Sequence, residues 1–190
     1  MWHALVCGLH TQFAVTMTLA RAFFRSGLLL LAILLTSPAP AKAAFDLHWL
    51  WHNQCYECHG HAGDFARKYL TVDKGELQGW HHVHDLRRFL QHHYLAPDDV
   101  DGVYQMLLAQ AATPPRFKEA CTGCHGTAAD FVRTTLELRN GVLYSRTAGT
   151  PVHDVLTRHR ALQPADVAFF LQQLTRVAHE VFQPVTAQQH

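Results

Sequence analysis

Two short segments of the chain carry the same arrangement of cysteine and histidine. Residues 55–59 read CYECH and residues 121–125 read CTGCH, so each segment has two cysteines followed directly by a histidine. Thiols react covalently, and thiols and imidazoles both bind transition metals. The side chains with this chemistry are Cys55, Cys58, His59, Cys121, Cys124 and His125.

Four kinds of site are compatible with C-x-x-C. A thioredoxin-like redox pair needs a βαβ context, which the sequence lacks. Structural disulfides do not require a histidine after each pair. A Cys₄ zinc site is the strongest alternative, but zinc ribbons separate their pairs by roughly 15–20 residues, and 62 residues lie between Cys58 and Cys121.

The fourth kind of site is C-x-x-C-H, the attachment sequence of c-type haem. Its two thiols add to the vinyl groups of the porphyrin, and the adjacent imidazole then reaches the iron. Both copies together use four of the five cysteines, and Cys7 lies in the N-terminal region discussed below. The sequence therefore predicts two covalently attached haem c groups.

The repetition extends beyond the two motifs. With a shift of 66 residues, apolar, charged and glycine positions match from each motif onward, and a slip of one residue aligns Pro97 with Pro164. The copies join near residue 112, in a stretch rich in Ala, Thr and Pro. We therefore predict a first haem domain over residues 44–112 and a second over 113–190.

Each unit is expected to be mainly helical with one short β-hairpin. Helices are predicted near 47–54, 83–93 and 97–107 and again near 117–120, 151–159 and 164–174. Hairpins are predicted over 70–77 and 136–144, where Lys74-Gly75 and Asn140-Gly141 provide the turns; Asn-Gly is the stronger signal. Units of about 65 residues are marginal for an unaided apolar core, and a bound macrocycle would add apolar bulk.

Residues 1–43 have the pattern of a secretory signal. A basic flank precedes the apolar run 27–35, and an A-x-A sequence ends near Ala43. The run is too short to span a bilayer of roughly 30 Å. We predict cleavage near Ala43 and an exported mature protein without a membrane span. Met17 is an alternative start, and an uncleaved anchor is the alternative to cleavage.

The chain resembles the c-type cytochromes, and its duplicated form resembles a dihaem cytochrome c with two tandem class I-like haem domains. The resemblance rests on the two motifs and on the closing helices after Pro97 and Pro164. It implies a periplasmic electron carrier between a redox donor and a redox acceptor protein, rather than an enzyme. With 16 Lys and Arg against 15 Asp and Glu, nothing indicates nucleic acid or identifies the partner.

The second axial ligand of each iron must come from outside the motifs. The cytochromes commonly supply methionine, but the one methionine after the signal is Met106, inside the last helix of the first unit. We expect His93 and His159, which each lie 34 residues after a motif histidine and on the apolar face of a predicted helix. The alternatives are His92 in the first unit and the pair His84 and His153.

Two imidazole ligands leave no open position on the iron, which favours electron relay. The alternative functions are a haem-based binder or sensor of small ligands and a haem subunit of a larger oxidoreductase complex. Arg67 and Arg133 match between the copies. They are candidates to neutralise haem propionates, or else solvated charges on a helix.

Overall fold

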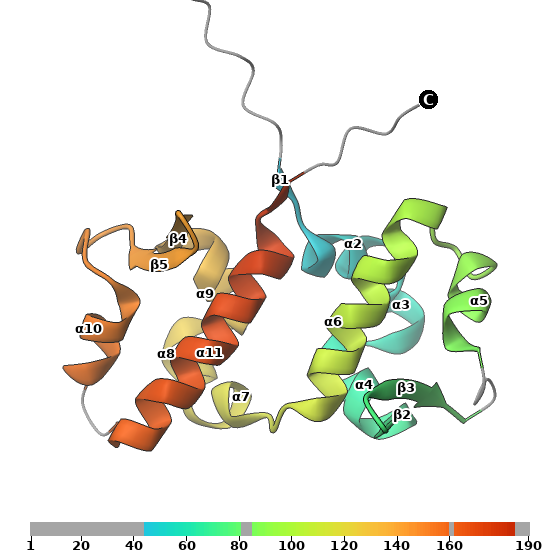
Figure 1. The fold of residues 1–190 in the computed structure, drawn as a ribbon, viewed down its shortest axis with the longest axis horizontal. Coiled ribbons are helices and arrows are strands. Elements are labelled where there is room, and N and C mark those ends of the chain that lie inside the picture. The colour runs from blue at the N-terminus through green and yellow to red at the C-terminus, as the bar shows by residue number, and fades with distance from the viewer. Residues whose placement is uncertain (1–43, 81–84, 160–161, 185–190) are drawn as a thin grey trace, which may run out of the picture. The chain divides into compact units, whose positions relative to one another are not determined.

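The computed structural model describes residues 44–80, 85–159 and 162–184, and Figure 1 shows how their helices and strands are arranged. Ala43–His190 form one compact unit. The predicted export signal and His84 lie outside the described residues. Within the described part, no helix combines the length and apolar character that crossing a bilayer requires.

The fold is mainly helical, as predicted. The helices are α2 (Leu47–Gln54), α3 (Tyr56–His59), α4 (Ala62–Tyr69), α5 (Leu86–Gln91), η1 (Pro97–Asp99), α6 (Val100–Ala112), α7 (Arg116–Ala120), α8 (Thr122–His125), α9 (Ala128–Thr135), α10 (Val152–Thr157) and α11 (Pro164–Val181). The strands are β1 (Ala44–Phe45), β2 (Leu70–Asp73), β3 (Glu76–Gly79), β4 (Leu136–Arg139), β5 (Val142–Ser145) and β6 (Gln183–Pro184).

The order of elements repeats along the chain. We call residues 44–112 the first half and residues 113–184 the second half. In each half a helix leads into a one-turn helix at the cysteine motif, and then come a second helix, a hairpin, a short helix and a long closing helix. The closing helices are α6 and α11. This repeated order is what the 66-residue sequence repeat implies.

Both predicted hairpins are confirmed. Strand β2 pairs antiparallel with β3, and β4 pairs antiparallel with β5. The turn residues all have positive φ, at 50° and 83° for Lys74 and Gly75 and at 50° and 79° for Asn140 and Gly141. Two consecutive left-handed residues define the type I′ turn, whose twist matches that of the flanking strands.

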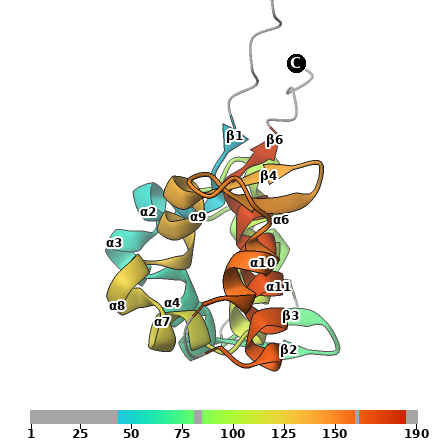
Figure 2. The ribbon, with the colours of Figure 1, turned by 90° about the vertical axis from the view of Figure 1, so that its left-hand side faces the viewer.

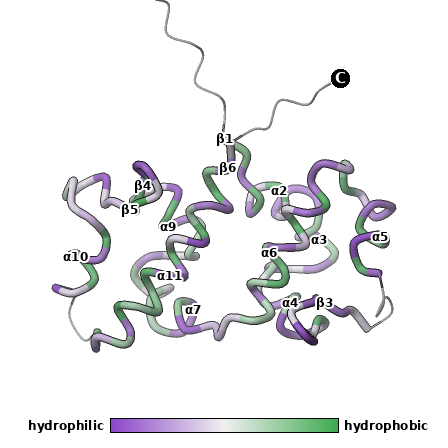
Figure 3. Tube along the Cα trace, viewed as in Figure 1, coloured by the Kyte–Doolittle hydropathy of each residue, from purple (hydrophilic) through white to green (hydrophobic). Residues whose placement is uncertain are grey.

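Buried apolar side chains form two clusters, one in each half. The first lies around α6, where Val103 and Met106 are each 1 % exposed, and the second lies around α11, where Leu174 and Val177 are each 1 % exposed. Hydrophobic stretches run along both helices (Figure 3). Each half thus has its own apolar cluster, although the division into two domains stays a prediction.

Several contacts join the halves. Strand β1 pairs antiparallel with β6, which brings the first described strand of the first half beside the last strand of the second (Figure 2). Side-chain contacts also cross between the halves: a His48–Glu180 hydrogen bond of 2.7 Å, and the ion pairs Lys118–Asp64 at 2.7 Å and Arg133–Asp46 at 2.8 Å.

Some elements differ from the sequence-based expectation. Helices α5 and α10 end before His93 and His159, whereas the predicted helices included both residues. In the first half the chain leaves the helix through a tighter turn, with the His93 N–H donating to the Leu90 carbonyl at 3.1 Å, and Tyr94 then takes a left-handed φ of 58°. Helices α4 and α9 and the β1–β6 pairing were not predicted.

Replacing Tyr104 with phenylalanine should destabilise the first half by about 1–3 kcal/mol, because a buried backbone donor would lose its partner. The Tyr104 hydroxyl accepts from the Leu77 N–H at 2.9 Å and donates to a Glu76 carboxylate oxygen at 2.6 Å, and the side chain is 2 % exposed. Burial, with this bond to Glu76, also raises the pKa of Tyr104. Chemical denaturation followed by circular dichroism measures the loss.

Tyr144→Phe is the matched control for Tyr104→Phe. Tyr144 lies on the second hairpin, and its hydroxyl makes no hydrogen bond to the residues that the structure describes. This variant should unfold at the same denaturant concentration as the parent protein. Equal stability of the two variants would contradict the role given to the Tyr104 hydroxyl.

Candidate functional site

The two cysteine motifs have the same backbone conformation. Cys55 has φ and ψ of −119° and −25°, and Cys121 has −118° and −26°. A single helical turn follows in each half, closed by the histidine N–H donating to the first cysteine's carbonyl at 2.9 Å for His59 and 3.0 Å for His125. The helical turn places the first cysteine, the second cysteine and the histidine at positions i, i+3 and i+4, which share one face of a helix.

A glycine after each histidine lets the chain leave this turn. Gly60 has φ of 65° and Gly126 has φ of 68°, in the left-handed region where glycine carries no steric cost. In the first half the Gly60 carbonyl accepts a hydrogen bond of 2.8 Å from the indole N–H of Trp51. Trp51 is 5 % exposed, so a buried side chain of α2 fixes the exit from the first motif.

The structure brings each motif histidine close to the histidine predicted as its partner. The ring centroids of His59 and His93 are 5.9 Å apart, and those of His125 and His159 are 6.3 Å apart. Metal–imidazole bonds of about 2 Å on opposite sides of one ion would place two such centroids about 6 Å apart. The spacing in both halves therefore suits a single metal ion between the two rings.

An apolar cleft surrounds the histidine pair of the first half. It is lined by Trp51, Cys55, His59, Phe65, Leu70, Leu86, Phe89, Leu90, His93, Leu95, Val103 and Leu107. The cleft brings together one of the two motif thiols, two imidazoles and a wall of apolar side chains, which are among the groups that a covalently bound porphyrin requires. The enclosed volume is about 60 Å³, so a macrocycle held there would widen the cleft or keep an edge in solvent.

Aromatic rings hold the motif histidines in place. The centroid of Phe65 is 4.6 Å from that of His59, and the centroid of Phe131 is 4.6 Å from that of His125. His59 also contacts Trp51, and their ring centroids are 6.0 Å apart. The phenylalanines occupy equivalent positions in the repeat, so the same side chain orients the imidazole in both halves.

The pKa shifts of three motif residues favour a neutral His59 imidazole and argue against a redox-active dithiol. Burial, and next the charge of His93, lower the pKa of His59, which favours the neutral imidazole that binds metals. Burial, and next repulsion from the second cysteine, raise the thiol pKa of Cys55 and of Cys121. Redox-active C-x-x-C pairs rely instead on a lowered thiol pKa.

The alternative ligands are less well placed. His92 is exposed at the end of α5, and the side chain of His153 is 60 % exposed with its ring 3.3 Å from Asp154. Met106 is 1 % exposed within the apolar cluster of α6. His84 lies outside the described residues. His93, half-buried in the cleft, is therefore the best-placed second imidazole of the first half.

The arginines that match between the copies lie at a different place. Arg67 and Arg133 line a second cavity, between the halves. Each is paired with the acidic residue three positions earlier, at 3.2 Å for Asp64 and 2.6 Å for Asp130. Their charge is thus met by carboxylates of the chain, which leaves no support for the proposed contact with propionates.

A Cys₄ zinc site needs all four cysteines together. Among the residues that can be described, no group of three or more His, Cys, Asp or Glu side chains is arranged to hold a metal ion. A porphyrin supplies four nitrogen ligands of its own, so only two side chains have to meet.

Comparisons with protein-family models, curated proteins and solved structures find no match to this chain.

Proposed function

We propose that the chain is a dihaem c-type cytochrome that carries electrons between redox partner proteins in the periplasm. One observation carries this proposal. In each half a helical turn bearing C-x-x-C-H lies beside a second histidine, at the ring spacing of 5.9 Å or 6.3 Å that a shared metal ion requires. The resemblance of both motifs to c-type cytochromes supports the same function.

The residues that would hold the cofactors divide into two equivalent sets. Cys55 and Cys58, or Cys121 and Cys124, would form the thioether bonds, and the histidine pairs would bind iron from both sides. When bound, haem supplies an iron that accepts and returns one electron. The proposed iron ligands are His59 and His93 in the first half and His125 and His159 in the second half.

The surroundings of these residues suit electron transfer. The two imidazoles proposed to hold each iron would stabilise its ferric state more than a thioether would, so the reduction potentials should lie below those of His/Met cytochromes. The apolar cleft wall of the first half limits the contact of His59 and His93 with water, which would lower the local dielectric constant. The chain's own part is to hold each pair of imidazoles at a fixed separation.

A second candidate function applies to the second half. His125 and His159 are both exposed, whereas His59 and His93 are half-buried. A more exposed ligand is easier to displace, which favours a binder or sensor of small ligands at that site. Mixing the reduced protein with carbon monoxide separates the two functions, because an electron relay should not respond rapidly and a ligand binder should.

Mass spectrometry of the exported protein tests the main proposal. We expect a polypeptide that begins near Ala44 and carries two covalent haem adducts, with low-spin spectra in both oxidation states and no long-wavelength sulfur-to-iron band. Retention of the segment over 1–43 would support the anchor and leave the haem proposal intact. A mass without adducts, or zinc in their place, would contradict the proposal.

A further inference from the structure

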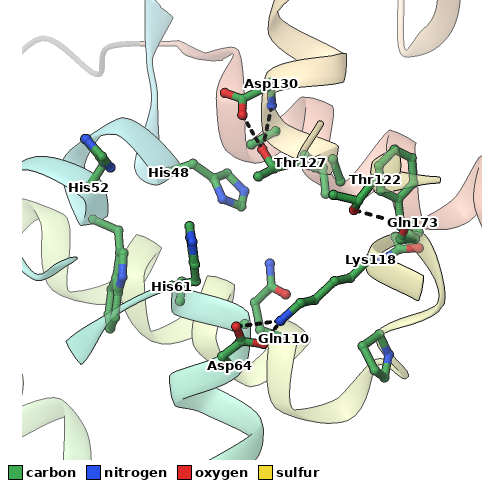
Figure 4. Close-up of a pocket in the computed structure, with 18 of the residues that line it drawn as sticks. His48, His52, His61, Asp64, Gln110, Lys118, Thr122, Thr127, Asp130 and Gln173 are labelled. Atoms are coloured by element: carbon green, nitrogen blue, oxygen red, sulfur yellow. Dashed lines mark hydrogen bonds and ion pairs between the residues drawn. The ribbon is translucent and has the colours of Figure 1, made fainter. Parts of the chain in front are cut away.

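A cavity of about 420 Å³ lies between the two halves, away from the histidine pair of the first half. It is bordered by α2 and α4 of the first half and by residues of α7, α9 and α11 of the second. Figure 4 shows the rings of His48 and His61 pointing into the space and Lys118 reaching across to Asp64. Its volume is within the range of about 300–1,000 Å³ common for small-molecule sites.

The cavity is a product of the duplication. Many of its lining residues occupy equivalent positions in the two copies. The pairs that show this most clearly are Trp51 with Phe117, Asp64 with Asp130 and Arg67 with Arg133. The two halves therefore present the same surfaces to each other, and the cavity lies where these surfaces meet.

The walls differ where the first half carries rings. Trp49, His52, Tyr56 and His61 line the cavity, and the second half has Pro115, Lys118, Thr122 and Thr127 at the same positions. The four rings form a continuous series, with successive centroids 5.6, 5.2 and 5.0 Å apart. Trp49 is 56 % exposed and Tyr56 is 37 % exposed, so part of each ring can contact a ligand. His52 stacks on Trp49, and the Arg133 guanidinium lies 5.7 Å from the centroid of a Trp49 ring.

The cations that line the cavity contact carboxylates of the protein, Arg176 among them through Glu180. Lys118 and Arg67 both contact Asp64, and Arg133 contacts Asp130 and also Asp46, outside the cavity. An anion would have to compete with these carboxylates. The cavity therefore suits a neutral ligand whose flat face packs against the rings.

Polar groups on several sides of the cavity can orient such a ligand. The ring of His48 points into the cavity (Figure 4). Its Nε2 is 2.7 Å from a Glu180 carboxylate oxygen, so its Nδ1, on the other side of the ring, is directed away from Glu180. Gln110 and Thr122 also lie at the wall. Hydroxyl or carbonyl oxygens on a ligand would find both donors and acceptors here.

The cavity also touches both predicted haem-attachment segments. Tyr56 lies between Cys55 and Cys58, Thr122 is at the equivalent position of the second motif, and both line the cavity. Trp51 lines this cavity and the cleft of the first half at once. A ligand in the cavity would lie beside the attachment segments of both halves.

We infer that this cavity binds a neutral, planar, oxygen-bearing aromatic molecule of the quinone and hydroquinone class. The row of aromatic rings, the cations that contact carboxylates of the protein and the inward polar groups define the chemistry of the ligand. The choice of a redox-active class rests on the proposed function, because the site adjoins both attachment segments. The cavity itself depends only on the packing of the two halves.

Isothermal titration calorimetry of the oxidised holoprotein with 1,4-naphthoquinone tests the site. One molecule should bind per chain, and naphthalene, which has the same rings without oxygens, should bind more weakly. Replacing Trp49 with alanine, or Tyr56 with the threonine that the second half carries at the equivalent position, should weaken binding about 2- to 10-fold by loss of ring packing.

Trp80→Ala is the matched control, because Trp80 is 84 % exposed and lies outside the cavity. It should leave the dissociation constant unchanged. No measurable binding, or equal affinity in the Trp49 and Trp80 variants, would overturn the inference. Mass spectrometry of the same samples reports the haem adducts separately. Two adducts without quinone binding would contradict the proposed site and leave the proposed function intact. Quinone binding without adducts would contradict the proposed function and the choice of a redox-active ligand.

Discussion

Replacing His93 or His159 with alanine should convert one of the two haems from low spin to high spin. Alanine offers no donor atom, so the iron would keep only His59 or His125 as its protein ligand and would bind water or nothing opposite it. The ring centroid of His93 is 5.9 Å from that of His59, and the ring centroid of His159 is 6.3 Å from that of His125. These distances suit two imidazoles bound to one metal ion. Visible absorption and electron paramagnetic resonance of the purified variants measure the change.

Covalent attachment should survive these substitutions. The thioether bonds depend on the cysteines of each motif, and the motif turn is held by its own backbone hydrogen bonds rather than by the second histidine. The mass of each variant should therefore still show two haem adducts. A mass with one adduct would contradict this expectation and would mean that the second histidine is needed for attachment.

His92→Ala and His153→Ala are the controls for ligand assignment. His92 follows α5 and is exposed, while His153 lies on α10 with its ring directed toward Asp154 at 3.3 Å. Both variants should keep two low-spin haems. If His92→Ala changes the spin state and His93→Ala does not, the ligand assignment in the first half is wrong.

The local parts of this architecture were predictable from sequence because short-range signals determine them. Asn140-Gly141 favours a type I′ turn whatever surrounds it, and the structure has that turn. The spacing of Cys55, Cys58 and His59 corresponds to one helical turn, which α3 provides. Gly60 supplies the positive φ that ends the turn.

The surroundings of the site were not predictable, because they depend on contacts between distant residues. Trp51 and Phe65 orient His59, but an aromatic residue in an amphipathic helix gives no indication of which ring it will contact. A repeated phenylalanine at a fixed distance after both motifs is the signal that could have identified Phe65 and Phe131. The cavity between the halves had no counterpart in the sequence reasoning.

His93 lies close to His59, although one of the two sequence signals that predicted this does not hold in the structure. The helical-face reasoning assumed a helix through residue 93, whereas α5 ends at Gln91. The repeat itself was the stronger signal, since an equal distance from each motif histidine implies an equivalent place in each half. The structure places His93 and His159 after α5 and α10, each with its N–H bonded to the carbonyl three residues earlier.

Replacing both Cys55 and Cys58 with alanine should remove one covalent haem and strongly destabilise the first half. Any haem then held through His59 and His93 alone becomes extractable with acidified acetone, and the mass of the polypeptide shows a single adduct. Without the bound macrocycle the apolar wall of the cleft faces water, and burial of even one large apolar side chain is worth about 1.5–3 kcal/mol. A unit of about 65 residues has little reserve against such a loss.

The destabilisation should be confined at first to the half that loses its haem, because the apolar clusters of the two halves are separate. Hydrogen exchange should accelerate over 86–91 while 152–157 stays protected, and thermal unfolding followed by circular dichroism should separate into two steps. The matched variant, with Cys121 and Cys124 replaced, should reverse the pattern. Equal destabilisation of both halves in both variants would contradict this expectation. The protein would then unfold as one cooperative unit, held together by the β1–β6 pairing and the side-chain contacts between the halves.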